Sequence, residues 1–218
     1  MVSKKYDTVL FDLDGTLTDP RLGITNSIQY ALKSFGITET DREHLTNFIG
    51  PPLIESFMHY YHFDKNTAIR AVEKYREYFT VKGIFENSVY QQVPELLAEL
   101  TDEGKKLLLA TSKPLVFAQR ILDYFKLSSY FHFTAGSNLD GTRTKKSEVI
   151  SYALLECRLQ AGTNAVMIGD RKYDIIGARE TGLDSVGVLY GYGSRQEMEK
   201  EDPTHMVETV AGLRAVLL

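Results

Sequence analysis

The stretch Thr8-Val-Leu-Phe-Asp12-Leu-Asp14-Gly-Thr16 decides the fold of this chain. It begins as a short apolar run, the pattern of a strand that is buried on both faces of a sheet. Two acids, a glycine that allows a sharp turn and a hydroxyl follow directly. The stretch therefore predicts a buried strand with a polar loop, starting at Asp12, at its carboxyl end.

Similar apolar runs recur along the chain, and helix-like stretches separate them. Strands that alternate with helices in this way form right-handed βαβ units around a parallel sheet. The predicted fold class is therefore α/β, with a Rossmann-like parallel sheet core. The further strands are expected at 107–110, 130–135, 165–168 and 185–189, and the helices are expected to begin near Pro94, Pro114, Lys145 and Asp174.

Between residues 17 and 83 the strand pattern disappears and helical periodicity, rich in Tyr, Phe and charge, takes its place. This change predicts an all-helical insert, 17–83, in a core domain made of 1–16 and 84–218. Hinges are expected at 17–20 and 82–85. Within the insert, breaks at Gly36, at Gly50-Pro-Pro52 and near Phe63 divide the pattern into four helices. These helices are expected at 23–35, 41–47, 52–61 and 66–81.

The composition excludes several classes of protein. Of the 218 residues 43% are hydrophobic, enough for a buried core, and the formal net charge of −4 argues against a nucleic acid polymer as partner. No apolar run approaches the roughly 20 residues of a membrane span, and the first residues do not form a signal-peptide core. Cys157 is the single cysteine and is expected to be a buried structural thiol. We expect a cytoplasmic protein with a small, diffusible partner.

Four acids are expected to meet at one edge of the sheet. Asp170 and Asp174 follow the strand at 165–168 as Asp12 and Asp14 follow the first. In an open parallel sheet, loops at the carboxyl ends of neighbouring strands converge. Four carboxylates there would repel one another unless a cation is bound, and oxygen ligands suit magnesium. The pattern predicts a Mg²⁺ site.

A hydroxyl and a lysine complete this set. Thr111 ends the strand at 107–110, directly before a helix start whose free N–H groups suit an anion. Lys145 and Lys146 both lie in the first turn of another helix, so that one of them can reach the same crevice. A carboxylate nucleophile, magnesium, a hydroxyl and a lysine together indicate phosphoryl transfer.

These motifs, taken in order, closely resemble the haloacid dehalogenase superfamily of hydrolases. The resemblance rests on Asp12-Leu-Asp14-Gly-Thr16, then Thr111, Lys146, and Gly169-Asp170 with Asp174. It covers essentially the whole chain, including a helical cap inserted after the first motif. Further stretches look like the phosphoglycolate phosphatase and 5′-nucleotidase branch: Ile49-Gly-Pro-Pro-Leu53, Thr111-Ser-Lys-Pro114 and residues 169–178.

The resemblance implies a role for each matching residue. Asp12 would be the nucleophile, and Asp14 would protonate the leaving oxygen and then take a proton from water. Mg²⁺ would be held by the Asp12 carboxylate, the Asp14 main-chain carbonyl and Asp170, with Asp174 nearby. The catalytic set is then Asp12, Asp14, Thr111 and Lys146, and the phosphate-binding set is Gly15, Thr16, Thr111, Ser112 and Lys146.

Substrate recognition is expected to come from the cap. Its loop at Gly50, within Ile49–Leu53, is expected to project over the crevice as a lid. Arg21 is a candidate for an anionic group of the substrate, and Tyr190-Gly-Tyr-Gly193 is expected to line the rim. The implied substrate is a small phosphorylated metabolite, phosphoglycolate or a nucleoside monophosphate.

Other interpretations stay open at this point. Lys145 competes with Lys146 for the phosphate, and a phosphomutase of the β-phosphoglucomutase type or a non-catalytic regulatory protein would share the fold. A dehalogenase is disfavoured by the acid at Asp14. The chain is expected to be a monomer or a homodimer. Surface, packing or ion-pair roles are expected for His44, His59, His62, Lys113, Arg171 and Lys172.

Overall fold

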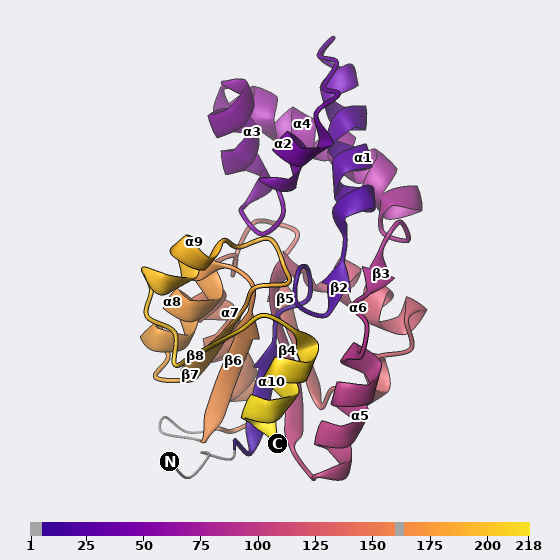
Figure 1. Cartoon of the computed structure of the whole chain (residues 1–218). Coiled ribbons are helices and arrows are strands. Elements are labelled where there is room, and N and C mark those ends of the chain that lie inside the picture. Colours follow the sequence, from indigo (N-terminus) through magenta and orange to yellow (C-terminus); the bar gives the residue numbers. More distant parts are fainter. Residues whose placement is uncertain (1–5, 160–163) are drawn as a thin grey trace. The chain divides into compact units, whose positions relative to one another are not determined.

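The computed structural model describes residues 6–159 and 164–218 (Figure 1). The expectation about a signal peptide concerns the first residues, which lie mostly outside this described part. Contacts divide the chain into a sheet unit, Met1–Thr18 with Val89–Leu218, and a helical unit, Asp19–Ser88. The helical unit includes residues 84–88, which the sequence pattern assigns to the core. Glu86 explains this difference, because its main-chain oxygen and its carboxylate accept hydrogen bonds from Gly23 and Asn26 of the first helix.

The sheet unit is built on six parallel strands, which confirms the predicted α/β fold class. The first strand lies in the middle of the sheet, between two strands that come much later in the chain. In sheet order the strands are β5 (Phe133–Ser137), β4 (Lys106–Pro114), β1 (Thr8–Phe11), β6 (Ala165–Gly169), β7 (Asp184–Val188) and β8 (His205–Val207).

The register of the three central strands determines where the polar loops lie. Phe11 of β1 pairs with Leu109 of β4 on one side and with Ile168 of β6 on the other. The residues that follow each of these three positions therefore reach the same edge of the sheet. This register brings the loops that begin at Asp12 and Asp170 together with the end of β4 at Thr111.

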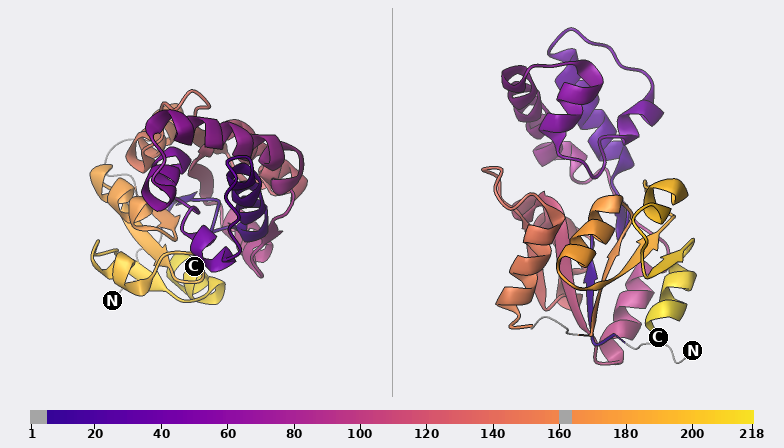
Figure 2. Two further views of the ribbon diagram at one scale, coloured as in Figure 1. Left: turned by 90° about the horizontal axis from the view of Figure 1, so that it is seen from above. Right: turned by 90° about the vertical axis from the view of Figure 1, so that its left-hand side faces the viewer.

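Helices cover both faces of this sheet (Figures 1 and 2). Because the crossovers between parallel strands are right-handed, the direction in which the chain moves along the sheet decides the face that each helix covers. On one face lie α5 (Val93–Asp102), α6 (Leu115–Tyr124) and α10 (Val210–Leu217); on the other lie α7 (Lys146–Glu156) and α8 (Lys172–Glu180), with the short α9 (Arg195–Glu199) beside α8.

One apolar cluster of the sheet unit lies between the central strands and α7. Leu10, Leu108 and Met167 each come from a different strand and are fully buried. Val149 and Ile150 of α7 pack in the same cluster. Burial of this apolar surface stabilises the unit and places the first turn of α7 against the carboxyl ends of the strands.

Some elements of the sheet unit differ from the prediction. The strand expected at 130–135 begins only at Phe133, because Ser128–Tyr130 form a 3₁₀ turn whose hydrogen bonds use the local backbone. Strand β4 continues past Ala110 to Pro114, which pairs with Ser137 of β5 after an irregularity in the register. Beyond residue 189, where the pattern predicts no element, lie α9, β8 and α10.

The helical unit contains the four predicted helices, with small shifts at their ends. Asp41 and Asp64 cap two of them, because each carboxylate accepts a hydrogen bond from a free N–H group of the first turn. The helices are α1 (Arg21–Lys33), α2 (Arg42–Thr46), α3 (Leu53–Tyr61) and α4 (Lys65–Tyr78), and a π-helical turn, Phe79–Gly83, follows. The connecting strands β2 (Thr18–Asp19) and β3 (Ser88–Val89) pair with each other.

Aromatic rings form much of the core of the helical unit. The rings of Phe48 and Phe57 lie 5.1 Å apart and are both buried. Tyr75 and Phe79 are also buried, with stacked rings 5.2 Å apart. Tyr60, Tyr61 and Tyr78 are only half-buried, because phenolic oxygens such as that of Tyr78, which donates to Glu86, stay near polar groups.

Two expectations concern surface and membrane properties. Cys157 follows the last residue of α7 and is half-buried, so the prediction of a buried thiol is wrong, although the burial that remains raises the pKa of this thiol. Within the described part of the chain, no helix combines the length and the apolar character that a membrane span requires.

The core of the sheet unit can be tested with a pair of leucines. We expect Leu10→Ala, in the fully buried centre of β1, to lower the free energy of unfolding by about 3 kcal/mol through lost burial and a residual cavity. Leu155→Ala removes the same atoms from a side chain that is 73% exposed and should change it by less than about 0.5 kcal/mol. Urea unfolding followed by circular dichroism measures both, and equal effects would contradict this description of the core.

Candidate active site

The loop after β1 places Asp12 and Asp14 at the edge of the sheet. The N–H of Asp12 donates to the main-chain oxygen of Ile168 at 2.9 Å, which continues the pairing with β6. Gly15 follows with a φ of +81°, and a Cβ atom there would lie 2.1 Å from Oδ2 of Asp170. Only glycine fits this turn, because the loop after β1 passes so close to the loop after β6.

Three carboxylates meet at this edge. Asp12, Asp170 and Asp174 each offer an oxygen, and these oxygens lie within 4.8 Å of one another. All three residues are buried, and Asp170 is fully so. Within residues 6–159 and 164–218, no other group of three or more His, Cys, Asp or Glu residues is arranged in this way. The carboxylate of Asp14 lies outside the group.

Lys146 lies against two of these carboxylates. Its Nζ is 2.9 Å from Oδ1 of Asp12 and 2.8 Å from Oδ1 of Asp174, and it donates to the main-chain oxygen of Ala110 at 3.0 Å. The residue is 5% exposed. Lys145, its competitor in the sequence, is exposed at the start of α7. The structure thus brings Lys146, and not Lys145, into the cluster.

Burial and mutual repulsion shift the ionisation of these groups. Burial, and then the charges of Asp174 and Asp12, raise the pKa of Asp170 well above its ordinary range. Burial also raises the pKa of Asp174 to about 6, although Lys146 opposes this rise. Burial alone would lower the pKa of Lys146, but the charges of Asp12 and Asp174 outweigh it and raise this pKa. The cluster therefore holds more negative charge than Lys146 compensates.

The segment 190–193, expected to line the rim, packs against Asp170. The N–H of Tyr192 donates to Oδ2 of Asp170 at 2.7 Å, and a Cβ atom at Gly191 would lie 2.4 Å from Cβ of Asp170. The hydroxyl of Tyr190 donates to the main-chain oxygen of Thr16 at 3.0 Å. One oxygen of Asp170 is thereby fixed, and no hydrogen-bond donor of the described residues reaches the other, Oδ1.

Thr111, Ser112 and Lys113 follow in the extended end of β4. Thr111 is buried, its hydroxyl accepts a hydrogen bond from the N–H of Lys113 at 3.2 Å, and Ser112 is half-buried. The Nζ of Lys113 lies 2.5 Å from Oδ2 of Asp14. Burial raises the pKa of Asp14, although Lys113 opposes this rise. Lys113 is therefore ion-paired, as expected, but its partner belongs to the candidate site itself.

Glu197 is a contributor that the sequence pattern does not indicate. The Nε of Arg171 donates to its Oε1 at 3.0 Å, and the N–H of Lys172 donates to the same oxygen at 2.9 Å. These bonds hold the start of α8, which carries Asp174 in its first turn. No motif surrounds Glu197 in the sequence, so only its place on α9 reveals this contact.

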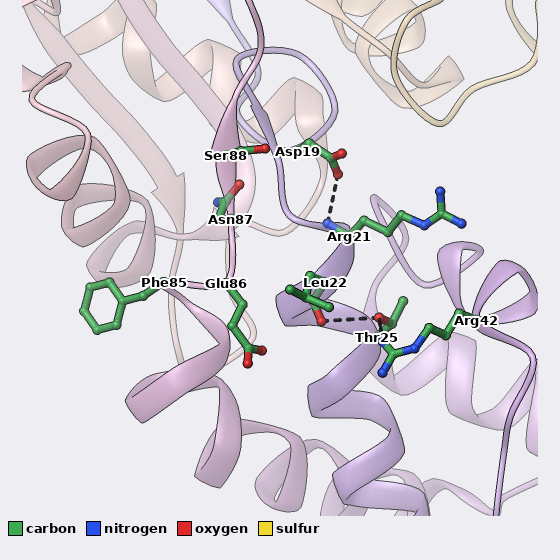
Figure 3. Close-up of a pocket in the computed structure, with 9 residues that line it drawn as sticks. All are labelled: Asp19, Arg21, Leu22, Thr25, Arg42, Phe85, Glu86, Asn87 and Ser88. Carbon is green, nitrogen blue, oxygen red and sulfur yellow. Dashed lines mark hydrogen bonds between the residues drawn. The ribbon is translucent and has the colours of Figure 1, made fainter.

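The helical unit contains the other predicted site residues, Arg21 and Gly50. Arg21 begins α1, and its guanidinium pairs with Glu43. Gly50 is exposed, with a φ of +103° in the turn before α3. This unit also contains a pocket of about 440 Å³. Its lining residues, drawn in Figure 3, are Asp19, Arg21, Leu22, Thr25, Arg42, Phe85, Glu86, Asn87 and Ser88.

The three histidines of the helical unit do not form a metal site with other residues in the part of the chain that the structure describes. The Nδ1 of His44 lies 3.4 Å from Oε2 of Glu39, and its ring packs edge-on against Tyr60. The ring of His59 also packs against Tyr60. His62 directly follows α3 and has a left-handed backbone conformation. Packing contacts account for His44 and His59, as the sequence predicts.

Comparison with known proteins places this fold and site in a family. The model of the haloacid dehalogenase-like hydrolases matches residues 9–188, most of the chain. The chain therefore belongs to the haloacid dehalogenase-like hydrolase family, and the resemblance predicted from its motifs is confirmed.

Similar proteins narrow the class within this family. A 5′-nucleotidase of Pseudomonas aeruginosa is 49% identical over 98% of this chain and 96% of its own. The solved structure of a predicted phosphatase from Clostridium acetobutylicum is 48% identical, with a TM-score of 0.93 over 97% of each chain. A tyrosine-protein kinase, PtkA of Mycobacterium tuberculosis, is 36% identical over 96% of this chain and 72% of its own. The predicted class of enzyme, a phosphatase of this family, is confirmed.

The adjacent lysines allow a direct test of the charge cluster. We expect Lys146→Met to lower the free energy of unfolding by about 3 kcal/mol at pH 8, because two buried carboxylates lose their partner. Lys145→Met removes an exposed amine and should cost less than about 0.5 kcal/mol.

The cost of Lys146→Met to the free energy of unfolding should also depend on pH. The raised pKa of Asp174, about 6, means that its ionisation disfavours the folded state as the pH rises through this value. The cost of Lys146→Met should therefore shrink at pH 5, where protonation removes the unpaired charge. Urea unfolding in EDTA at both pH values measures this, and a cost independent of pH would contradict the assignment.

Proposed function

We propose that this protein is a Mg²⁺-dependent phosphatase that hydrolyses a small phosphorylated metabolite through an aspartyl-phosphate on Asp12. The single observation that carries the proposal is the convergence of Asp12, Asp170 and Asp174 around Lys146 at the end of the central strands. Burying such a cluster costs folding free energy, and binding of a cation and an anion would offset this cost.

The donor set fits a hard divalent cation. Oδ1 of Asp170 is buried and receives no hydrogen bond from the described residues, and the raised pKa of Asp170 is the shift that a cation would reverse. We propose that Asp12, Asp170 and Asp174 hold Mg²⁺, together with the main-chain carbonyl of Asp14 that the family resemblance implies. When bound, the ion supplies charge neutralisation for the phosphate oxygens.

The proposed reaction has two steps. In the first, an oxygen of Asp12 attacks phosphorus, the bond from phosphorus to the leaving oxygen breaks, and Asp14 gives that oxygen a proton. In the second, Asp14 takes a proton from the water that attacks phosphorus, and the Asp12 carboxylate is released with inorganic phosphate. Thr111 and Lys146 bind the transferring oxygens, assisted by Ser112, which follows Thr111 in β4, and by Gly15 and Thr16 in the loop after β1.

The substrate class that we propose is a nucleoside 5′-monophosphate, and phosphoglycolate is the second candidate. Support comes from the similarity to a 5′-nucleotidase over nearly the whole chain. We propose that the helical unit selects the substrate, with Arg21 and the turn at Gly50 as the first residues to test. A cytoplasmic location is part of the proposal, and the single cysteine agrees with a reducing compartment.

Transfer to an acceptor other than water is the alternative activity. A phosphomutase would share every residue of the cluster, and one similar protein is named a tyrosine kinase. The two activities separate in one assay, because a hydrolase releases inorganic phosphate at the rate at which the donor is consumed. The hydrolase proposal would be overturned if label moved from a bisphosphate to a hexose phosphate, or from a nucleotide to a tyrosine peptide, faster than inorganic phosphate is released.

The nucleophile is tested by removing its charge. Asp12→Asn should lower turnover of nucleoside monophosphates, phosphoglycolate and an aryl phosphate by at least about a thousandfold, because the amide cannot attack phosphorus. Asp102→Asn, which changes an exposed acid at the end of α5, is the matched control and should retain full activity. Release of inorganic phosphate measures both, and substantial turnover by Asp12→Asn would rule out the aspartyl-phosphate.

Metal binding is tested without any turnover. Mg²⁺ at ten times its Kd should add about 1.4 kcal/mol to the stability of the wild type. Asp170→Asn should abolish this gain, while the metal-free variant is at least as stable as the wild type, because a buried carboxylate with a raised pKa is gone. Asp140→Asn, an exposed acid, should keep the full gain. Thermal unfolding with and without MgCl₂ measures it, and an unchanged gain in Asp170→Asn would refute the assignment.

A further inference from the structure

Lys113 is a buried lysine whose amine the proposed reaction does not use. It lies near the end of β4, and its side chain is only 7% exposed. Its Nζ lies 2.5 Å from Oδ2 of Asp14, whose side chain is 14% exposed. Burying an ammonium group costs folding free energy, and a lysine exposed to solvent would not incur this cost.

The contact fixes one oxygen of Asp14. The other oxygen, Oδ1, is buried and receives no hydrogen bond from the residues that the structure describes. The hydrogen bond from Nζ of Lys113 to Oδ2 therefore orients the carboxylate of Asp14. Oδ1 is left as the atom of Asp14 able to exchange a proton with a bound molecule.

The backbone of Lys113 is also held within the candidate site. Its N–H donates to the hydroxyl of Thr111 at 3.2 Å, which ties the backbone of Lys113 to that side chain at the end of β4. Asp14 belongs to the loop after β1, whereas Thr111 and Lys113 belong to β4. Lys113 thus connects the carboxyl ends of two neighbouring strands, and its amine reaches the carboxylate from a fixed direction.

We propose that Lys113 is a positioning residue, which holds the carboxyl group of Asp14 in the place from which it transfers a proton to the leaving oxygen. This inference rests on the proposed function, in which Asp14 is the acid and base. Lys113 acts through Asp14 and forms no bond with phosphorus or with the leaving group.

The proposal predicts a dependence on the leaving group. An alkoxide, such as the 5′-oxygen of a nucleoside, leaves poorly without a proton, whereas p-nitrophenolate leaves readily as the anion. Loss of the acid's position should therefore slow hydrolysis of an alkyl phosphate much more than that of p-nitrophenyl phosphate. A general disturbance of the fold would slow both to the same extent.

The first experiment compares Lys113→Met with the wild type on these two substrates. We expect kcat for a nucleoside monophosphate to fall at least about tenfold more than kcat for p-nitrophenyl phosphate, with KM little changed. Lys113→Arg, which retains a cation near Asp14, should recover part of this loss. If Lys113→Met does not fold, Lys113→Gln carries the same expectation. Equal loss on both substrates would overturn the proposal.

The second experiment tests whether Lys113 acts through Asp14. Asp14→Asn should show the same selective loss, and adding Lys113→Met to it should cost almost nothing further. If the two losses instead multiply, Lys113 has a separate role and the proposal is wrong. If the wild type has no phosphatase activity on any substrate, the proposed function is refuted. If the wild type is active but Lys113→Met slows both substrates equally, only the role of Lys113 is refuted.

Lys105 supplies a matched control. It precedes the same strand at the opposite end, is 8% exposed, and its Nζ donates to the main-chain oxygen of Tyr6 at 2.8 Å. Lys105→Met therefore also removes a buried amine that donates a hydrogen bond to an oxygen. It should lower stability without changing the ratio of the two kcat values, whereas a changed ratio would show that loss of any buried lysine has this effect and would overturn the proposal.

Discussion

Nζ of Lys146 lies within 3 Å of both Asp12 and Asp174, and the arrangement of the sheet unit depends on this charge balance. Buried carboxylates on neighbouring loops repel one another, and one ammonium group offsets part of that repulsion. Helix α7 must therefore present Lys146 at the carboxyl edge of the sheet. Its residues Val149 and Ile150 hold it there through the apolar core, so packing and charge act on the same helix.

The loops around the remaining negative charge are closely packed. Tyr192 and the narrow turn at Gly15 hold Asp170 from two sides and leave one of its oxygens without a donor. Lys113 does the same for Asp14. In each carboxylate one oxygen is fixed and the other remains available, which is the arrangement that binding or proton transfer requires. In the proposed function, binding of Mg²⁺ and a phosphate would offset the free energy that burial of these charges costs the folded protein.

The two units divide the chemistry between them. The sheet unit contains every predicted residue that would meet the phosphate or the metal, and its strands hold these residues at fixed positions. The helical unit carries Arg21, Gly50 and a pocket of its own, built on an aromatic core. Residues that would recognise the rest of a substrate are therefore free to vary without disturbing the charge cluster.

The sequence by itself determined the α/β class, the four helices of the insert and the acids of the site, because buried strands and the loops after them leave strong local patterns. Only the tertiary structure decided between Lys145 and Lys146, since both lie in one helical turn and burial distinguishes them. It also decided the partners of Lys113 and Glu197. These contacts join residues far apart in the chain, and no local pattern records which distant side chain the packing of the sheet will bring near.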